Sequence, residues 1–158
     1  MTVYQLPLKS ELLDSPPPTA REAELGVICS ILLEPEIIPQ VAKVIREYDF
    51  HGYDTRRAYT LSRWLYRTTG NVDSKALLEA LQKNDSAPFG WQKFVESIIE
   101  VMPHSQDWRR FADAVRRAAH ARWMIGTLLD AVRALYHGAN PQTVSVKLDR
   151  LLTRERKR

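Results

Sequence analysis

The chain has 158 residues, of which 44% are hydrophobic and 27% are charged, and its formal net charge is +4. This composition is typical of a globular domain that buries a core, and the mild positive charge permits a nucleic-acid partner without arguing for one. The apolar runs are too short to cross a membrane, and the N-terminus lacks the apolar segment of a signal peptide. Because Cys29 is the only cysteine, an intrachain disulfide is impossible, and we expect a cytoplasmic protein.

Residues 1–19 are expected to form an extended arm, because three consecutive prolines end it and favour a polyproline conformation. Residues 20–103 predict a helical head, since apolar residues recur every three or four positions and no segment alternates like a strand. The head should contain about five helices, starting near residues 20, 35, 54, 73 and 91, with a loop at 84–90.

Polar residues suited to helix caps precede three of these helices. Thr19, with Glu22 three residues later, predicts a capping box for the first helix. Asp54 or Thr55 is expected to cap the third helix, and Asp73 the fourth.

The longest predicted helix covers residues 105–137, which contain no proline and one glycine. At a rise of 1.5 Å per residue it would be about 48 Å long, longer than the roughly 40 Å diameter of a compact chain of this size. We therefore expect this rod to overhang the head. Gly138 should end the rod, and Asn140 as N-cap with Pro141 in the first helical position predicts a return helix over 141–152.

Together these elements predict an all-α protein in which a small orthogonal head is followed by a protruding antiparallel hairpin, residues 104–154, and a charged tail, residues 155–158. One face of the rod carries an apolar seam with nearly heptad spacing, and a seam that overhangs its globule needs a partner. The seam consists of Phe111, Val115, Ala118, Arg122, Ile125, Leu129, Val132 and Tyr136.

The motifs of common catalytic and metal sites are missing from the sequence. The six glycines form neither GxxxxGK[ST] nor GxGxxG, the four histidines do not form HExxH, and no serine lies in GxSxG. We therefore predict no catalytic residue, no cofactor and no metal, and look for surfaces that bind other macromolecules.

Two sets of residues are candidates for such surfaces. The first is an apolar interface on the hairpin, comprising Trp108, Phe111, Val115, Arg122, Ile125, Leu129, Leu148 and Leu151. The second is a basic stripe that recurs every seven residues, comprising Arg109, Arg110, Arg116 and Arg117. The stripe is interpreted either as a contact for phosphates or an acidic partner, or as a solvated helix face.

Two positions in the middle of the rod leave alternatives open. Arg122 lies within the seam, where it either pairs with a carboxylate such as Asp130 of another chain or extends its head group to water. Gly126 marks either a close crossing of two hairpins or a point where the rod bends.

The order of these parts resembles the N-terminal domain of bacterial replicative DNA helicases of the DnaB type. Their characteristic opening corresponds here to Glu22-Ala23-Glu24, Val27-Ile28-x-Ser30-Ile31-Leu32, Glu34-Pro35 and Asp49-Phe50. A second segment of the family matches at Tyr59, Leu65, Tyr66, Gly70 and Asp73. The resemblance covers about residues 15–152, and Pro39 and Arg57 depart from the family pattern.

The resemblance implies an assembly and docking module without catalysis of its own. In the family, hairpins pair between subunits, six domains form a collar as a trimer of dimers, and the collar binds primase and affects helicase loading. The ATPase domain that follows in the family does not follow within this sequence. A regulator or decoy of a helicase is therefore an alternative, as is a DNA-binding domain that uses the Arg109–Arg117 stripe.

Overall fold

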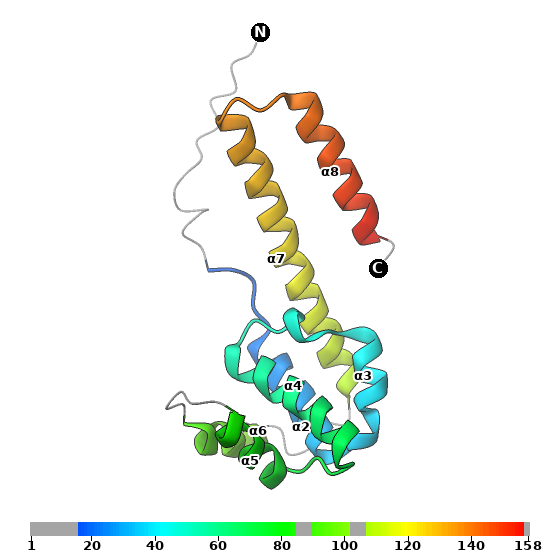
Figure 1. The fold of residues 1–158 in the computed structure, drawn as a ribbon, viewed down its shortest axis with the longest axis vertical. Coiled ribbons are helices and arrows are strands. Elements are labelled where there is room, and N and C mark those ends of the chain that lie inside the picture. The colour runs from blue at the N-terminus through cyan, green and yellow to red at the C-terminus, as the bar shows by residue number, and fades with distance from the viewer. Residues whose placement is uncertain (1–15, 85–89, 102–106, 157–158) are drawn as a thin grey trace.

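The computed structural model describes residues 16–84, 90–101 and 107–156. Within these residues the chain is entirely helical and contains no strand, so the predicted all-α class is confirmed. The helices α2 to α6 gather into a head, α7 leaves the head, and α8 folds back beside α7 (Figure 1). The elements are α2 Arg21–Leu33, η1 Pro35–Ile37, α3 Ile38–Val44, η2 Glu47–Asp49, α4 Tyr53–Thr68, α5 Ser74–Asn84, α6 Trp91–Val101, α7 Trp108–Tyr136 and α8 Pro141–Arg156.

Some predicted features lie outside the described residues. These are most of the arm, the loop at 85–89, the segment 102–106 where the rod was expected to begin, and the last two residues of the tail.

The helix α2 is the centre of the head. Every residue from Ala23 to Ile31 is buried, because α4, α6 and α7 all pack against it. This explains why its sequence is apolar around its whole circumference rather than on one face, as expected for a helix enclosed by others.

Two of the three predicted caps in the head are wrong. The N-cap position of α2 is Ala20 and that of α4 is Gly52, and neither makes a side-chain capping bond. The predicted cap of α4 is absent because the Glu24 carboxylate, from α2, accepts hydrogen bonds from the backbone N–H groups that precede α4. The cap predicted at Asp73 is confirmed, since its Oδ1 accepts a hydrogen bond from the Ala76 N–H at 2.8 Å.

The second predicted helix is divided into η1 and α3, and Pro39 lies in the first turn of α3. A proline is tolerated there because the N–H groups of a first turn have no partner within the helix. The turn that follows α4 contains Gly70, whose φ of 69° is in the region that favours glycine.

The rod is present as α7, which continues through Gly126 without interruption. Its first turns are not part of the overhang, because Trp108, Ala112 and Val115 are buried in the head core. Phe111 also packs into the head, where its ring lies 2.7 Å from the position that a Cβ on Gly26 would occupy. The boundary between head and hairpin therefore falls inside α7 rather than in a loop.

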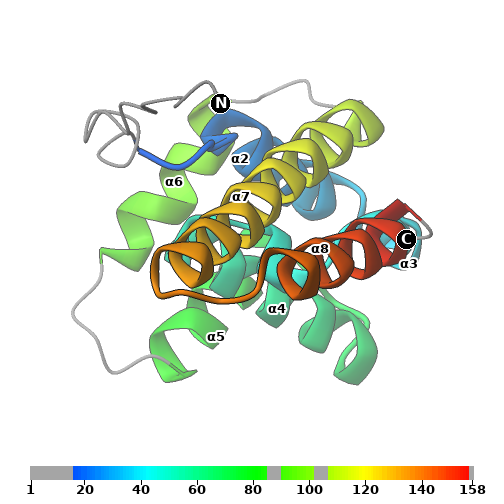
Figure 2. The ribbon, with the colours of Figure 1, turned by 90° about the horizontal axis from the view of Figure 1, so that it is seen from above.

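The hairpin is antiparallel and its turn follows the predicted chemistry. Gly138 has a φ of 82°, and the Asn140 side chain accepts a hydrogen bond from the Gln142 N–H at 2.9 Å. Viewed from above, α8 lies along one side of α7 and ends near α3 (Figure 2). It continues to Arg156, so Glu155, which was assigned to the tail, is on a helix.

Among the described helices, none alone is long and apolar enough to cross a membrane. Together, α2 and the segment Pro35–Val44 are long and apolar enough by length and composition alone, but they meet at a bend of 116°.

Candidate interaction surface and basic cleft

The overhanging part of the hairpin carries uncovered apolar side chains. In the described residues, six of the eleven large apolar side chains that are exposed belong to α7 and α8, although these helices form only about a third of those residues. Isolated exposed apolar residues are normal, but a concentration of them on one element marks an interaction surface. The six are Ile125, Leu128, Val132, Leu135, Tyr136 and Val146.

The structure divides the residues predicted for the apolar interface into two groups. Trp108 and Val115 are buried in the head, and Phe111 is partly buried against it. They stabilise the head core and are not on the free surface, because the head covers the first turns of the seam. Ile125 is exposed and Leu129, Leu148 and Leu151 are half-buried on the hairpin, so these four remain candidates for pairing.

Arg122 has partners within its own chain. Its guanidinium donates hydrogen bonds to the carbonyl oxygen of Pro18, at 2.9 Å, and to the carbonyl oxygen of Asp49. Partial burial lowers the pKa of Arg122 below its ordinary value. The side chain thus fastens the middle of α7 to the end of the N-terminal arm and to η2, while it remains partly exposed.

The basic stripe is also divided. The Arg109 guanidinium lies 4.6 Å from the centre of the Trp108 ring and donates a hydrogen bond to Gln40, so it has a structural role beside the head. Arg110 is exposed and Arg116 forms an exposed ion pair with Asp113 at 3.6 Å. Of the four stripe residues, Arg116 and Arg117 line a cleft formed with residues of the head and of α8.

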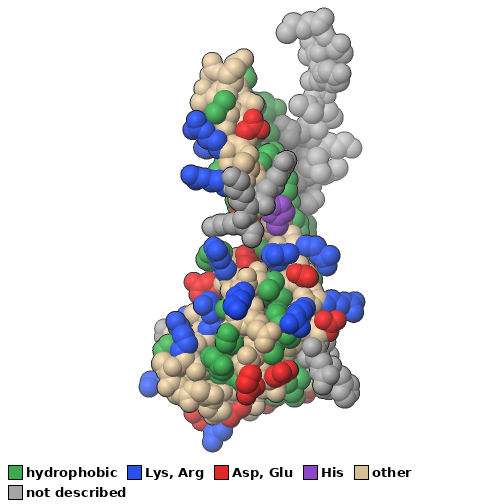
Figure 3. All heavy atoms as spheres, turned by 90° about the vertical axis from the view of Figure 1, so that its right-hand side faces the viewer, with side chains coloured by type: hydrophobic (Ala, Val, Ile, Leu, Met, Phe, Trp, Pro, Cys, Tyr) green, Lys and Arg blue, Asp and Glu red, His purple; other side chains and the backbone are tan. Residues whose placement is uncertain are grey.

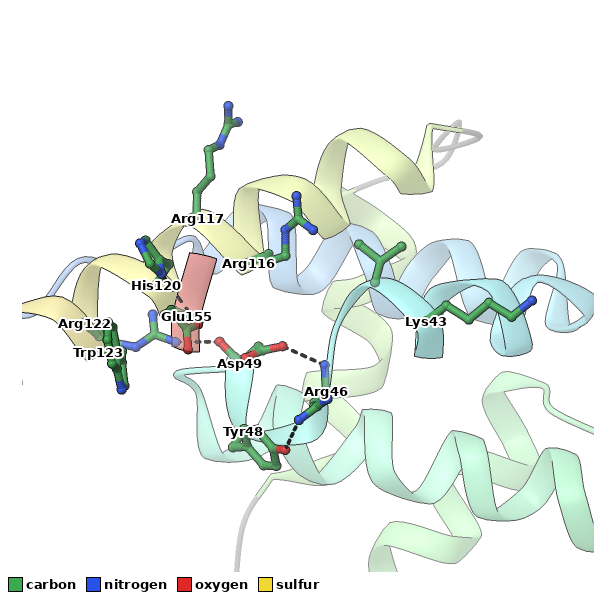
Figure 4. Close-up of a pocket in the computed structure, with 12 residues that line it drawn as sticks. Lys43, Arg46, Tyr48, Asp49, Arg116, Arg117, His120, Arg122, Trp123 and Glu155 are labelled. Carbon is green, nitrogen blue, oxygen red and sulfur yellow. Dashed lines mark hydrogen bonds and ion pairs between the residues drawn. The ribbon is translucent and has the colours of Figure 1, made fainter. Parts of the chain in front are cut away.

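This cleft lies where the end of α8 approaches the junction of α7 with the head, and its volume is about 760 Å³. The residues from η2, α7 and α8 converge there, whereas Arg117 and Lys43 extend outward at the rim (Figure 4). Lys and Arg side chains gather on the same face at the waist of the molecule (Figure 3).

Two acidic residues moderate the charge of the cleft. Asp49 accepts a hydrogen bond from the Arg46 N–H at 2.7 Å, and Glu155 lies 3.7 Å from the His120 ring nitrogen. Tyr48 contributes a ring that is 58% exposed, and its hydroxyl accepts a hydrogen bond from the Arg46 guanidinium at 3.0 Å. The hydrogen bond to Tyr48 raises the pKa of Arg46, so this side chain stays charged.

A buried carboxylate that the sequence analysis did not single out holds the head together. Glu24 is 1% exposed, and its oxygens accept hydrogen bonds from the His51 N–H at 2.6 Å, the Gly52 N–H at 3.1 Å and the Thr55 hydroxyl at 2.5 Å. It therefore takes the place of a local cap at the start of α4. In the sequence, Glu24 is a charged residue within the apolar run of the first helix and belongs to the Glu22-Ala23-Glu24 segment of the resemblance, but neither feature reveals its partners.

Next to Glu24, an ion pair links the same two helices. The Arg21 guanidinium donates two hydrogen bonds to the Asp54 carboxylate at 2.5 Å. Burial acts to raise the pKa of Asp54, but the bonds from Arg21 and from the Thr55 N–H act in the opposite direction and leave this pKa below its ordinary value.

In the described residues, no group of three or more His, Cys, Asp or Glu side chains is placed to hold a metal ion. Cys29 is buried in the head core.

The model of the DnaB-like helicase N-terminal domain family matches residues 16–117. The match covers more than half of the chain, and the chain belongs to this family. Solved structures that share its fold include the crystal structure of the N-terminal domain of DnaB helicase from Mycobacterium tuberculosis. That structure is 21% identical, with a TM-score of 0.74, and the alignment covers 84% of this chain and 94% of that one. No curated protein matches the chain in sequence.

The family assignment fits the geometry. The family model ends at residue 117, where α7 leaves the head, and the shared fold with the mycobacterial domain extends over most of the chain. The matched domain is the non-catalytic N-terminal part of these helicases, and the sequence contains neither GxxxxGK[ST] nor GxGxxG.

Proposed function

We propose that this chain is a replication-type interaction and oligomerisation module that pairs through its helical hairpin and docks a primase or a helicase loader in the cytoplasm. The observation that carries the proposal is the concentration of exposed apolar side chains on the overhanging hairpin. Burying such a patch against a second copy removes apolar surface from water, which is the main driving force of association.

The hairpin has the shape that self-pairing requires. The two helices are joined by a short turn and contact each other, and Val144 is buried. However, Leu128, Leu135 and Val146 remain exposed, so α7 and α8 do not cover each other completely. Two hairpins that lie side by side would complete a small bundle, in which each supplies the apolar face that the other lacks.

A charge introduced into the hairpin should prevent pairing. Ile125 is 45% exposed on the hairpin, and Ile99 is 50% exposed on α6 in the head, so Ile99→Asp is a matched control for Ile125→Asp. We expect the unaltered chain and Ile99→Asp to self-associate equally in sedimentation velocity at micromolar concentration. Ile125→Asp should raise the dissociation constant by about tenfold or more, because an interface cannot bury an unpaired carboxylate cheaply.

Two results would contradict the proposal. One is a strict monomer at high micromolar concentration for the unaltered chain, and the other is an equal loss of association in both variants.

Docking is tested separately by capture of purified primase, loader or helicase on the immobilised chain. Binding to the helicase alone, which is abolished by Ile125→Asp, would favour the regulator over a module that docks primase.

A further inference from the structure

The basic cleft between head and hairpin is a second surface, and the hairpin pairing proposed above does not use it. Its lining includes five Lys and Arg residues and two carboxylates, which leaves a surplus of three positive charges in a chain whose formal net charge is +4. Two of these cations, Lys43 and Arg117, extend outward at the rim, and the others line the cleft itself (Figure 4). The cations are Lys43, Arg46, Arg116, Arg117 and Arg122.

The cations come from two walls that the fold holds in fixed positions. Lys43 and Arg46 come from the head, and Arg116 and Arg117 come from α7. Arg122 joins the walls, since it lies on α7 and donates a hydrogen bond to the carbonyl oxygen of Asp49 in η2. Positive charges fixed on facing walls attract an anionic chain that runs between them.

The lining also contains aromatic rings. Trp123 lies stacked on His120 with ring centres 5.8 Å apart, and Tyr48 on the opposite wall is 58% exposed. Cationic grooves with aromatic side chains are the usual means of binding single-stranded nucleic acid, because the backbone follows the charges and the bases stack on the rings. A duplex would require a protruding element that enters a groove, whereas this site is concave.

We propose that the cleft binds a short stretch of single-stranded nucleic acid, with its phosphates on Arg46 and Arg116 and a base near Tyr48 or Trp123. An acidic protein segment is the less suitable occupant, because its carboxylate side chains do not stack on the exposed rings of the lining as bases do. The cleft volume of about 760 Å³ suits one or two nucleotides, as in other enclosed sites for small molecules.

The test is a titration of a fluorescently labelled oligothymidylate of about 12 nucleotides with the full chain. Fluorescence anisotropy measures the binding at low and at physiological salt. Binding should weaken as salt rises, with a logarithmic slope of about −2 if roughly three phosphates are neutralised. Arg116→Glu should weaken binding by about tenfold or more at low salt, since it replaces an attraction by a repulsion.

A matched control is available on the same helix. Arg133 is exposed on α7 and does not line the cleft. It forms an ion pair at 3.1 Å with Asp130, three residues before it, in the same way as Arg116 pairs with Asp113. Arg133→Glu changes the net charge equally and removes an equivalent ion pair, and should alter binding by no more than about twofold. Arg46→Glu, on the opposite wall, should resemble Arg116→Glu.

Aromatic contact is tested by a second pair of variants. Trp123→Ala should weaken binding by about fivefold or more through lost stacking, whereas Trp64→Ala, which removes a ring that is 45% exposed on α4, should not. Circular dichroism shows whether each variant is folded.

Three outcomes would overturn the proposal. They are no binding of the oligonucleotide at about 50 mM salt, equal losses for Arg116→Glu and Arg133→Glu, and displacement of the oligonucleotide by polyglutamate at an equal concentration of charges. The last would assign the cleft to an acidic protein. Sedimentation velocity of Arg116→Glu and Arg133→Glu separates this proposal from the oligomerisation proposal. Neither Arg116 nor Arg133 belongs to the exposed apolar surface, so both variants should still self-associate.

Discussion

Glu24 is the single side chain on which the junction between α2 and α4 depends. Its carboxylate accepts hydrogen bonds from two backbone N–H groups in front of α4, those of His51 and Gly52. A buried charge with several hydrogen bonds stabilises a fold, but the loss of one partner leaves the others unsatisfied.

Glu24→Ala should therefore lower the free energy of unfolding by about 2–4 kcal/mol in urea denaturation. Glu22, two residues earlier, is exposed, so Glu22→Ala is a matched control with an expected change below about 0.5 kcal/mol. Glu24→Gln keeps one acceptor oxygen and should fall between them. Equal effects of the two alanine substitutions would show that the buried carboxylate does not support α4.

At the scale of elements, the packing of α7 on α2 depends on Gly26. A Cβ at this position would lie 2.7 Å from the Phe111 ring, which is closer than a packed core accepts. Gly126, in contrast, lies in the exposed part of α7 and has nothing within 4 Å of the corresponding point.

The two glycines should respond in opposite directions to the same substitution. Gly26→Ala is expected to cost about 1–3 kcal/mol of unfolding free energy through overpacking. Gly126→Ala should stabilise the chain by about 0.5–1 kcal/mol, because alanine is a better helix former. Thermal unfolding measures both, and stabilisation by Gly26→Ala would show that Phe111 is not held against α2.

Gly126→Ala also decides between the two interpretations of that residue. If hairpins cross closely there, the alanine should weaken self-association while it stabilises the chain. If association is unchanged, Gly126 is a tolerated weak point of the helix.

The sequence predicted the elements well, because local patterns determine them. The rod, the stop at Gly138 and the return helix after Asn140 follow from periodicity, helix propensity and turn chemistry, all of which act over a few residues. The predicted cap of α4 was wrong because Glu24 acts across 27 residues of sequence, and no local pattern reveals that distance.

The candidate surfaces were predicted less well, because contacts between residues far apart in the sequence decide which side chains stay exposed. The seam is continuous in the sequence, but the head covers Trp108 and Val115 and leaves Ile125 open. The basic stripe is equally regular, yet only Arg116 and Arg117 meet the cations of the head, since tertiary packing decides which side chains share a cleft.

At the scale of the whole molecule, the head includes the start of the rod. Trp108, Ala112 and Val115 complete its core, and the family model likewise extends to residue 117. A chain that ends at residue 119 should retain a cooperatively unfolding head, whereas one that ends at residue 104 loses those side chains and should be less stable by about 4 kcal/mol or more.

Chemical denaturation of the two shortened chains, followed by tryptophan fluorescence, measures this difference. As a control, the chain that ends at residue 119 should fail to self-associate, because it lacks the exposed hairpin. Equal stability of both shortened chains would show that the head core is complete without α7.

The passage of α7 from the head core into the hairpin also has a mechanical consequence. A helix resists bending and twisting far more than a loop does, and no loop separates the core residue Val115 from the hairpin residue Ile125. A torque applied at the hairpin tip by a second copy is therefore delivered directly to the packing around Gly26 and Phe111. The hairpin and the head must turn together, so the orientation of one hairpin determines which side of its head faces a partner.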